Sequence, residues 1–110
     1  MPNGPERIRS SNGRMNLVGS RVKQLRKQKG FTQDQLCARI ADMTGGRWGP
    51  TWRDIYRVEA GTRIVSDLEL VALAGALGCK VAWLLLGDQH DIGGEEFSAQ
   101  LFSTDAKGPD

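Results

Sequence analysis

The sequence has little of what metal and disulfide sites require. Of its 110 residues, one is a histidine and two are cysteines. His90 stands in a polar segment without a second ligand nearby, so we expect no metal site. Cys37 and Cys79 lie far apart in apolar-periodic segments. Two buried free thiols are favoured there, and a disulfide stays open as the alternative.

Groupings of catalytic residues are also missing. No nucleophile stands beside a base. The Gly45-Gly46 pair lacks the preceding strand and the following Lys-Ser/Thr of a phosphate-binding loop. We therefore predict that the protein is not an enzyme, that it uses no cofactor and that it takes no small-molecule ligand.

Long apolar runs are absent as well. No stretch approaches the roughly 20 apolar residues that a membrane-spanning helix needs. The polar N-terminal residues lack the apolar core of a signal peptide. We expect a cytoplasmic protein without a membrane partner.

Positive charge is present but unevenly distributed. The net charge is +2, yet residues 88–110 carry −5, which leaves +7 for residues 1–87. A local excess of this size attracts polyanions. We divide the chain into a flexible basic N-terminal arm (1–16), a folded domain (17–87) and an acidic C-terminal tail (88–110).

Both ends leave alternatives open. The arginines of the arm are Arg7, Arg9 and Arg14. They can reach a minor groove, although a merely solubilising tail is favoured. The large apolar residues of the tail's centre are Phe97, Leu101 and Phe102. They can share one face of a short helix that packs on the domain or on a second subunit, or the tail is disordered.

Between these ends, apolar residues recur at helical spacing and no segment alternates like a strand. Glycines and capping residues delimit five segments. Ser66, with Glu69 three positions later, predicts a capping box. The sequence thus predicts an all-α domain with helices over residues 17–29, 33–43, 51–60, 67–77 and 81–86.

The segment 51–60 has two different faces. Ile55 and Val58 are three positions apart and point to one side. Thr51 can cap the first turn with Asp54 as its acidic partner, and Gly61 ends the helix. The outer positions carry Trp52, Arg53, Tyr56 and Arg57. We interpret this segment as a helix that binds an anionic partner, the alternative being that its arginines are ordinary solvated charges.

Residues 20–87 resemble the Cro/XRE family of helix-turn-helix DNA-binding proteins, whose best-known members are phage repressors. The resemblance depends on the order of several short matches, namely Arg21-Val22-Lys23-Gln24-Leu25-Arg26, Gly30-Phe31-Thr32-Gln33, Leu36, Ile55, Val58, Glu59, Gly61, Leu73-Ala74-Gly75-Ala76-Leu77-Gly78 and Trp83-Leu84-Leu85. It implies a compact five-helix, lambda-repressor-like domain that binds an operator as a homodimer. One difference from the family is a lengthened turn between helices two and three, at residues 42–50.

The resemblance also implies roles for single residues. Gln33 would meet a phosphate, while Trp52, Arg53 and Arg57 would meet base edges and nearby backbone. Further candidates for DNA contact are Arg47, Thr51, Tyr56 and Arg63. Arg26 and Glu59 would form a partly buried structural salt bridge.

These observations predict a sequence-specific DNA-binding transcriptional regulator, a repressor associated with the nucleoid. Its partners would be a double-stranded DNA operator and a second copy of the chain, since one short helix reads few base pairs. The alternative is a protein-interaction module on the same fold, such as an antitoxin or adaptor, which binds through its acidic tail.

Overall fold

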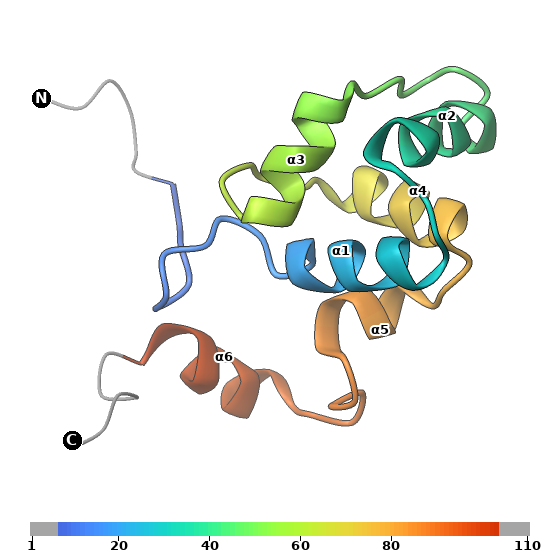
Figure 1. The fold of residues 1–110 in the computed structure, drawn as a ribbon. Helices are drawn as coiled ribbons and strands as arrows, with labels where there is room; N and C mark the ends of the chain where they lie inside the picture. Colours follow the sequence, from blue (N-terminus) through green and yellow to red (C-terminus); the bar gives the residue numbers. More distant parts are fainter. Residues whose placement is uncertain (1–6, 104–110) are drawn as a thin grey trace, which may run out of the picture.

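The computed structural model describes residues 7–103, which form six helices and no strand (Figure 1). This confirms the predicted all-α class. None of these helices is long and apolar enough to cross a membrane. The helices are α1 (Gly19–Gln28), α2 (Gln33–Met43), α3 (Trp52–Ala60), α4 (Asp67–Leu77), α5 (Val81–Leu86) and α6 (Gly94–Phe102).

The core lies where α1 to α5 meet. α4 packs against α1, α2 and α5, while α3 packs against α1 and α2. Each helix contributes apolar residues three or four positions apart, because that spacing repeats on one helix face. The largest fully buried side chains are Leu36, Ile40, Ile55, Leu73, Leu77, Leu84, Val22 and Val58.

Local capping sets most of the helix ends, as the sequence predicts. At the start of α4, the Ser66 hydroxyl accepts a bond from the Glu69 N–H, and the Glu69 carboxylate accepts one from the Ser66 N–H, both 3.1 Å long. α3 ends at Gly61, whose φ of 78° lies in the left-handed region that favours glycine. Predicted and observed bounds agree for α2, α4 and α5, which cover 33–43, 67–77 and 81–86.

α1 begins at Gly19, two residues later than the spacing predicts. The Asn16 side chain accepts bonds from the N–H groups of Val18 and Gly19, and its amide donates to the Val58 carbonyl at 3.1 Å. A β-carbon on Gly19 would lie 2.0 Å from that same carbonyl oxygen. Glycine is therefore needed here because α1 approaches the backbone of α3 closely.

The described part of the predicted flexible arm packs on the domain. Arg14 donates to the Glu59 carbonyl at 2.9 Å, and the Met15 N–H donates to the Gly61 carbonyl at 2.8 Å. The Ser11 N–H bonds the Leu101 carbonyl of α6 at 2.6 Å. Figure 1 shows this segment running between α3 and α6. Residues 1–6 lie outside the described range.

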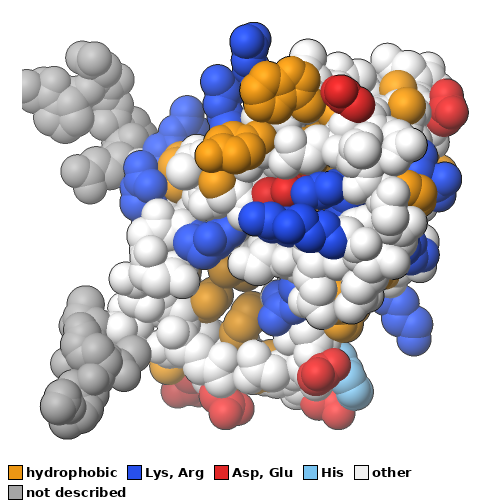
Figure 2. Space-filling model, in the orientation of Figure 1, with side chains coloured by type: hydrophobic (Ala, Val, Ile, Leu, Met, Phe, Trp, Pro, Cys, Tyr) orange, Lys and Arg blue, Asp and Glu red, His pale blue; other side chains and the backbone are white. Residues whose placement is uncertain are grey.

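The predicted acidic tail contains α6. Of the two alternatives for the centre of the tail, a short helix or disorder, the structure has the helix. Phe97 and Leu101 are half-buried, and Phe102 is 45% exposed. A cavity of about 280 Å³ remains between α6, the N-terminal segment, α1 and the end of α5. Figure 2 shows a hollow in this part of the surface. Residues 104–110 of the predicted tail lie outside the described range.

Candidate nucleic-acid interface

The outer face of α3 is basic and aromatic, whereas its inner face is apolar. Ile55 and Val58 are fully buried, but Trp52 is 47% exposed and Tyr56 is 58% exposed. Arg53 and Arg57 are exposed too. In Figure 2, Lys/Arg side chains and large hydrophobic side chains gather over the position of α3. The structure therefore brings together the residues that helical spacing predicts on the outer face of α3.

Arg53 and Arg57 have no acidic partner within salt-bridge distance in the described range. They are four positions apart and so lie on one stripe of α3. The Arg53 guanidinium lies 5.3 Å from the Trp52 ring centroid, close enough for a cation–π interaction. This stripe can donate several hydrogen bonds to an anionic or acceptor-rich surface.

The first turn of α3 is fixed by its own side chains. The Asp54 carboxylate accepts a bond from the Thr51 N–H at 2.9 Å and one from the Thr51 hydroxyl at 3.3 Å. The acidic half of the predicted cap is thus present. In this arrangement the Thr51 hydroxyl is used within the protein.

A buried ion pair links α1 to α3. Arg26 Nε lies 2.6 Å from Glu59 Oε2, and Arg26 Nη2 lies 3.1 Å from Glu59 Oε1. The two side chains are 9% and 4% exposed, which confirms the predicted Arg26–Glu59 salt bridge. Arg26 also donates to the Phe31 carbonyl at 2.7 Å. Gln33, proposed for a phosphate, instead donates its amide to Glu59 Oε1 at 3.1 Å.

Arg63, a further predicted DNA contact, forms an ion pair within the protein. Its guanidinium forms two bonds with the Glu69 carboxylate, at 2.8 and 3.0 Å, and lies 4.0 Å from Asp54. The bond from Arg63 lowers the pKa of Glu69. The Trp48 ring centroid is 5.7 Å from the same guanidinium. Arg63 therefore connects the start of α3 with the start of α4.

The lengthened turn is an ordered loop. The Thr44 hydroxyl accepts a bond from the Trp48 N–H at 3.1 Å and lies 3.2 Å from the Trp48 carbonyl, to which it donates. Gly45 and Gly46 have φ values of 61° and 82°, a conformation that side chains disfavour. Trp48 is half-buried and Arg47 is exposed beside it. Arg47, the residue of this loop that is predicted to contact DNA, is thus accessible.

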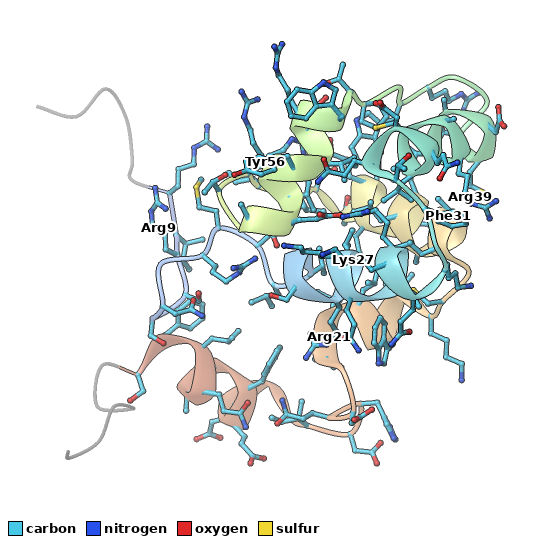
Figure 3. The ribbon with its side chains drawn as sticks, in the orientation of Figure 1. Arg9, Arg21, Lys27, Phe31, Arg39 and Tyr56 are labelled. Atoms are coloured by element: carbon cyan, nitrogen blue, oxygen red, sulfur yellow. The ribbon has the colours of Figure 1, made fainter. Side chains whose placement is uncertain are left out.

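Three further arginines have a role that sequence reasoning missed. Arg14, Arg21 and Arg39 donate to main-chain carbonyls in the last turns of α3, α5 and α4, where the helix dipole favours a cation. Figure 3 shows two of them, Arg21 and Arg39, away from Tyr56. Since their partners are 37 to 63 positions away, no local pattern reveals these bonds.

The described residues contain no other obvious reactive site. Burial raises the pKa of the Cys37 thiol to about 11 and also raises that of Cys79, and both thiols are free. No group of three or more His, Cys, Asp or Glu side chains within residues 7–103 is placed to hold a metal ion.

Comparisons with protein-family models, with curated proteins and with solved structures gave no significant match. The resemblance to the Cro/XRE family therefore depends on the residues quoted for it.

Proposed function

We propose that this protein is a sequence-specific DNA-binding transcriptional regulator with a lambda-repressor-like helix-turn-helix domain. In this proposal α3 enters the major groove of an operator and the bound protein represses transcription. The observation that carries the proposal is the division of α3 into two faces. Ile55 and Val58 are fully buried, while Arg53 and Arg57 are exposed and have no acidic partner within residues 7–103.

The side chains of this face suit the chemistry of a DNA groove. An arginine fork can donate two bonds to guanine O6 and N7, which discriminates by about 1–3 kcal/mol against other bases. Trp52 offers an apolar surface to a thymine methyl group. In this proposal Tyr56, which is exposed on the same face, and Arg47, which is exposed in the loop before α3, contact phosphates. Such contacts add affinity without adding sequence preference.

The buried ion pair supports the proposal in a different way. Arg26 and Glu59 join α1 to α3, and Gln33 joins the start of α2 to the same carboxylate. A base contact requires a helix with a fixed orientation, because a misplaced donor forms a poor hydrogen bond. This network holds α1, α2 and α3 together at one carboxylate.

Selection of binding sequences from a random DNA pool, followed by titration at two salt concentrations, tests the function. We expect a site with two-fold symmetry, since a homodimer presents two copies of α3. Arg53→Ala and Arg57→Ala should each weaken binding to that site by about 10- to 100-fold, the equivalent of losing a base contact. Loss of phosphate contacts instead would lower the salt slope by about 0.9 per contact.

Lys80→Ala is the matched control, because Lys80 is an exposed cation at the start of α5 rather than on α3. An equal loss in Lys80→Ala and Arg53→Ala would indicate general electrostatic attraction and contradict sequence reading by α3. Capture of a protein partner through Phe102, with no binding to any DNA, would favour the antitoxin or adaptor alternative.

A further inference from the structure

The cavity beside α6 has the size of a small-ligand site. Its volume is about 280 Å³, and its described lining residues come from the N-terminal segment, α1 and the residues just before it, the end of α5 and α6. Figure 2 shows hydrophobic side chains in this recess. Pockets for small molecules occupy roughly 300–1,000 Å³. The cavity is therefore close to the lower end of that range.

One part of the cavity wall is apolar. Phe97 and Leu101 are four positions apart, so they lie on one stripe of α6. Leu17 and Leu85 line the cavity from the folded domain. All four side chains are half-buried. A ligand with an apolar body would remove this surface from water, which is favourable.

Hydrogen bonds between segments hold the wall together. Gln100 Nε2 on α6 donates to Gln89 Oε1, after the end of α5, at 3.0 Å. The Ser11 N–H of the N-terminal segment donates to the Leu101 carbonyl at 2.6 Å. These bonds connect α6 to both of its neighbours around the cavity, so the lining residues keep their positions relative to one another.

Arg21 is the one cation among the described lining residues, which include no Asp or Glu. Its Nη1 donates to the Leu84 and Leu85 carbonyls, at 3.2 and 3.4 Å. Its Nε and Nη2 have no hydrogen-bond partner and no acidic partner within residues 7–103. No buried side-chain nitrogen in that range lacks a partner, so these two atoms are open to solvent.

The end of α5 fixes the Arg21 guanidinium. A β-carbon on Gly87 would lie 2.5 Å from Nη2 and 2.8 Å from Nε, so the guanidinium lies directly against the Gly87 backbone. Figure 3 shows Arg21 on the side of α1 that faces α5 and α6. A planar donor that is already held in place loses little freedom when it binds an anion.

We propose that this cavity binds a small organic carboxylate with an apolar body. The Nε and Nη2 groups of Arg21 donate side by side, and this arrangement matches the two oxygens of a carboxylate. The apolar body lies against Phe97, Leu101, Leu17 and Leu85. A half-buried guanidinium with unused donors beside apolar side chains gains from such an anion, because the bound charge offsets the lost hydration.

The inference goes beyond the proposed function. The sequence predicts no small-molecule ligand, because the residues that line the cavity come from both ends of the chain and share no local pattern. The described lining residues include none from α3. Binding of a carboxylate and binding of DNA are therefore tested by separate experiments, and either proposal can fail without the other.

An NMR titration of the full chain tests the site. The probes are hexanoate, benzoate and phenylacetate, each compared with its neutral amide, and inorganic phosphate. At least one carboxylate should bind saturably and shift the amide signals of Ser11, Gln89 and α6 but not those of α3. Its neutral amide should bind at least about 10-fold more weakly, because the charge-assisted bonds are lost. If no carboxylate binds, or if phosphate binds as tightly, the proposal is overturned.

Arg21→Gln should weaken carboxylate binding by about 10- to 100-fold, because the charged donors are removed. Circular dichroism checks that the variant is folded. Arg39→Gln is the matched control, because Arg39 also donates to a carbonyl at a helix end, that of Ala76, but does not line the cavity. Its affinity for the carboxylate should equal that of wild type. Equal affinities in Arg21→Gln and Arg39→Gln would overturn the assignment of Arg21.

A second pair of variants tests the cavity without altering Arg21. Gln100 and Ser98 are both exposed on α6, but only Gln100 lines the cavity. Gln100→Trp should weaken carboxylate binding at least several-fold, because the larger side chain takes up space at the cavity. Ser98→Trp should leave the affinity unchanged. Equal affinities in these two variants would place the bound carboxylate outside the cavity and contradict the proposal.

Discussion

α3 and α6 are both nine residues long, yet the protein uses them differently. α3 buries Ile55, Val58 and Glu59, begins with an acidic cap and ends at a left-handed glycine. α6 buries no residue completely, and its N-cap residue, Gly93, supplies no side-chain cap. It packs on the N-terminal segment beside a cavity of about 280 Å³.

The difference teaches that helix length says little about how firmly a helix is positioned. Two buried aliphatic side chains and one buried carboxylate fix α3, so its outer face can remain basic and exposed. α6 has half-buried contacts only and must depend on its neighbours. We therefore expect substitutions to affect stability strongly at the inner face of α3 and weakly in α6.

The largest effect should come from Glu59→Ala. The substitution leaves Arg26 buried without its carboxylate, and breaking a buried pair in this way costs about 3–5 kcal/mol. Urea denaturation measures the change in the free energy of unfolding. The double variant Arg26→Met/Glu59→Leu is the control and should recover much of the loss, because neither charge is then left unpaired. Equal losses in both variants would contradict an explanation based on a stranded charge.

Ile55→Ala should follow, with a loss of about 2–5 kcal/mol, because it opens a cavity under α3. Leu101→Ala in α6 is the comparison and should cost less than about 1.5 kcal/mol, since Leu101 is only half-buried and loses less apolar area. Both are measured as midpoints of urea denaturation with the slope held constant. A larger loss at Leu101 than at Ile55 would reverse the ranking of the two helices.

Lowering the pH should remove a smaller contribution to the free energy of unfolding, the one made by the Arg63–Glu69 ion pair. Arg63 lowers the pKa of Glu69 in the folded state below its ordinary value of 4.5. The resulting stability is therefore fully present above that value and is lost as the pH falls through the lowered pKa. Because the pair is partly solvated, we expect it to contribute less than about 1 kcal/mol.

Glu69→Gln isolates this contribution, because glutamine keeps the capping-box acceptor and removes the charge. The stability difference between wild type and Glu69→Gln should be present at neutral pH and vanish at low pH. Glu95→Gln, at an exposed position of α6, should show no comparable difference. A wild-type advantage that persists at low pH would show that the ion pair is not its source.

The smallest expected effect is a gain in α6. Gly93 has φ −78° and ψ 158°, which any residue can adopt, and a β-carbon there meets nothing within 4 Å. Gly93→Ser supplies the missing cap and should stabilise α6 by a few tenths of a kcal/mol. Hydrogen exchange should then slow in the α6 amides and not in those of α3. Slower exchange throughout the chain would instead indicate a global change.

Local sequence was sufficient for most helix boundaries. α2, α4 and α5 begin and end where their caps, glycines and apolar spacing predict. The Arg26–Glu59 pair was found through the family resemblance rather than through local spacing. The start of α1 was not predicted correctly, because Asn16 bonds the Val18 and Gly19 N–H groups and Gly19 contacts the α3 backbone.

The candidate site could be predicted only in part. The two faces of α3 follow from helical spacing within nine residues. The partners of Gln33 and Arg63 do not, and both side chains form bonds within the protein that the sequence did not indicate. Helical spacing also does not show which arginines form bonds within the protein and which remain accessible to a partner.

The sequence by itself determined the helices and the two-faced character of α3, because hydrogen bonds, caps and side-chain spacing in a helix involve residues at most a few positions apart. Only the tertiary structure decided which arginines are left for a partner. Arg14, Arg21 and Arg39 bond carbonyls 45, 63 and 37 positions away, and the packing of α2 against α4 leaves Leu68 and Val71 exposed. Contacts over such distances depend on how the helices pack, which spacing along the chain does not specify.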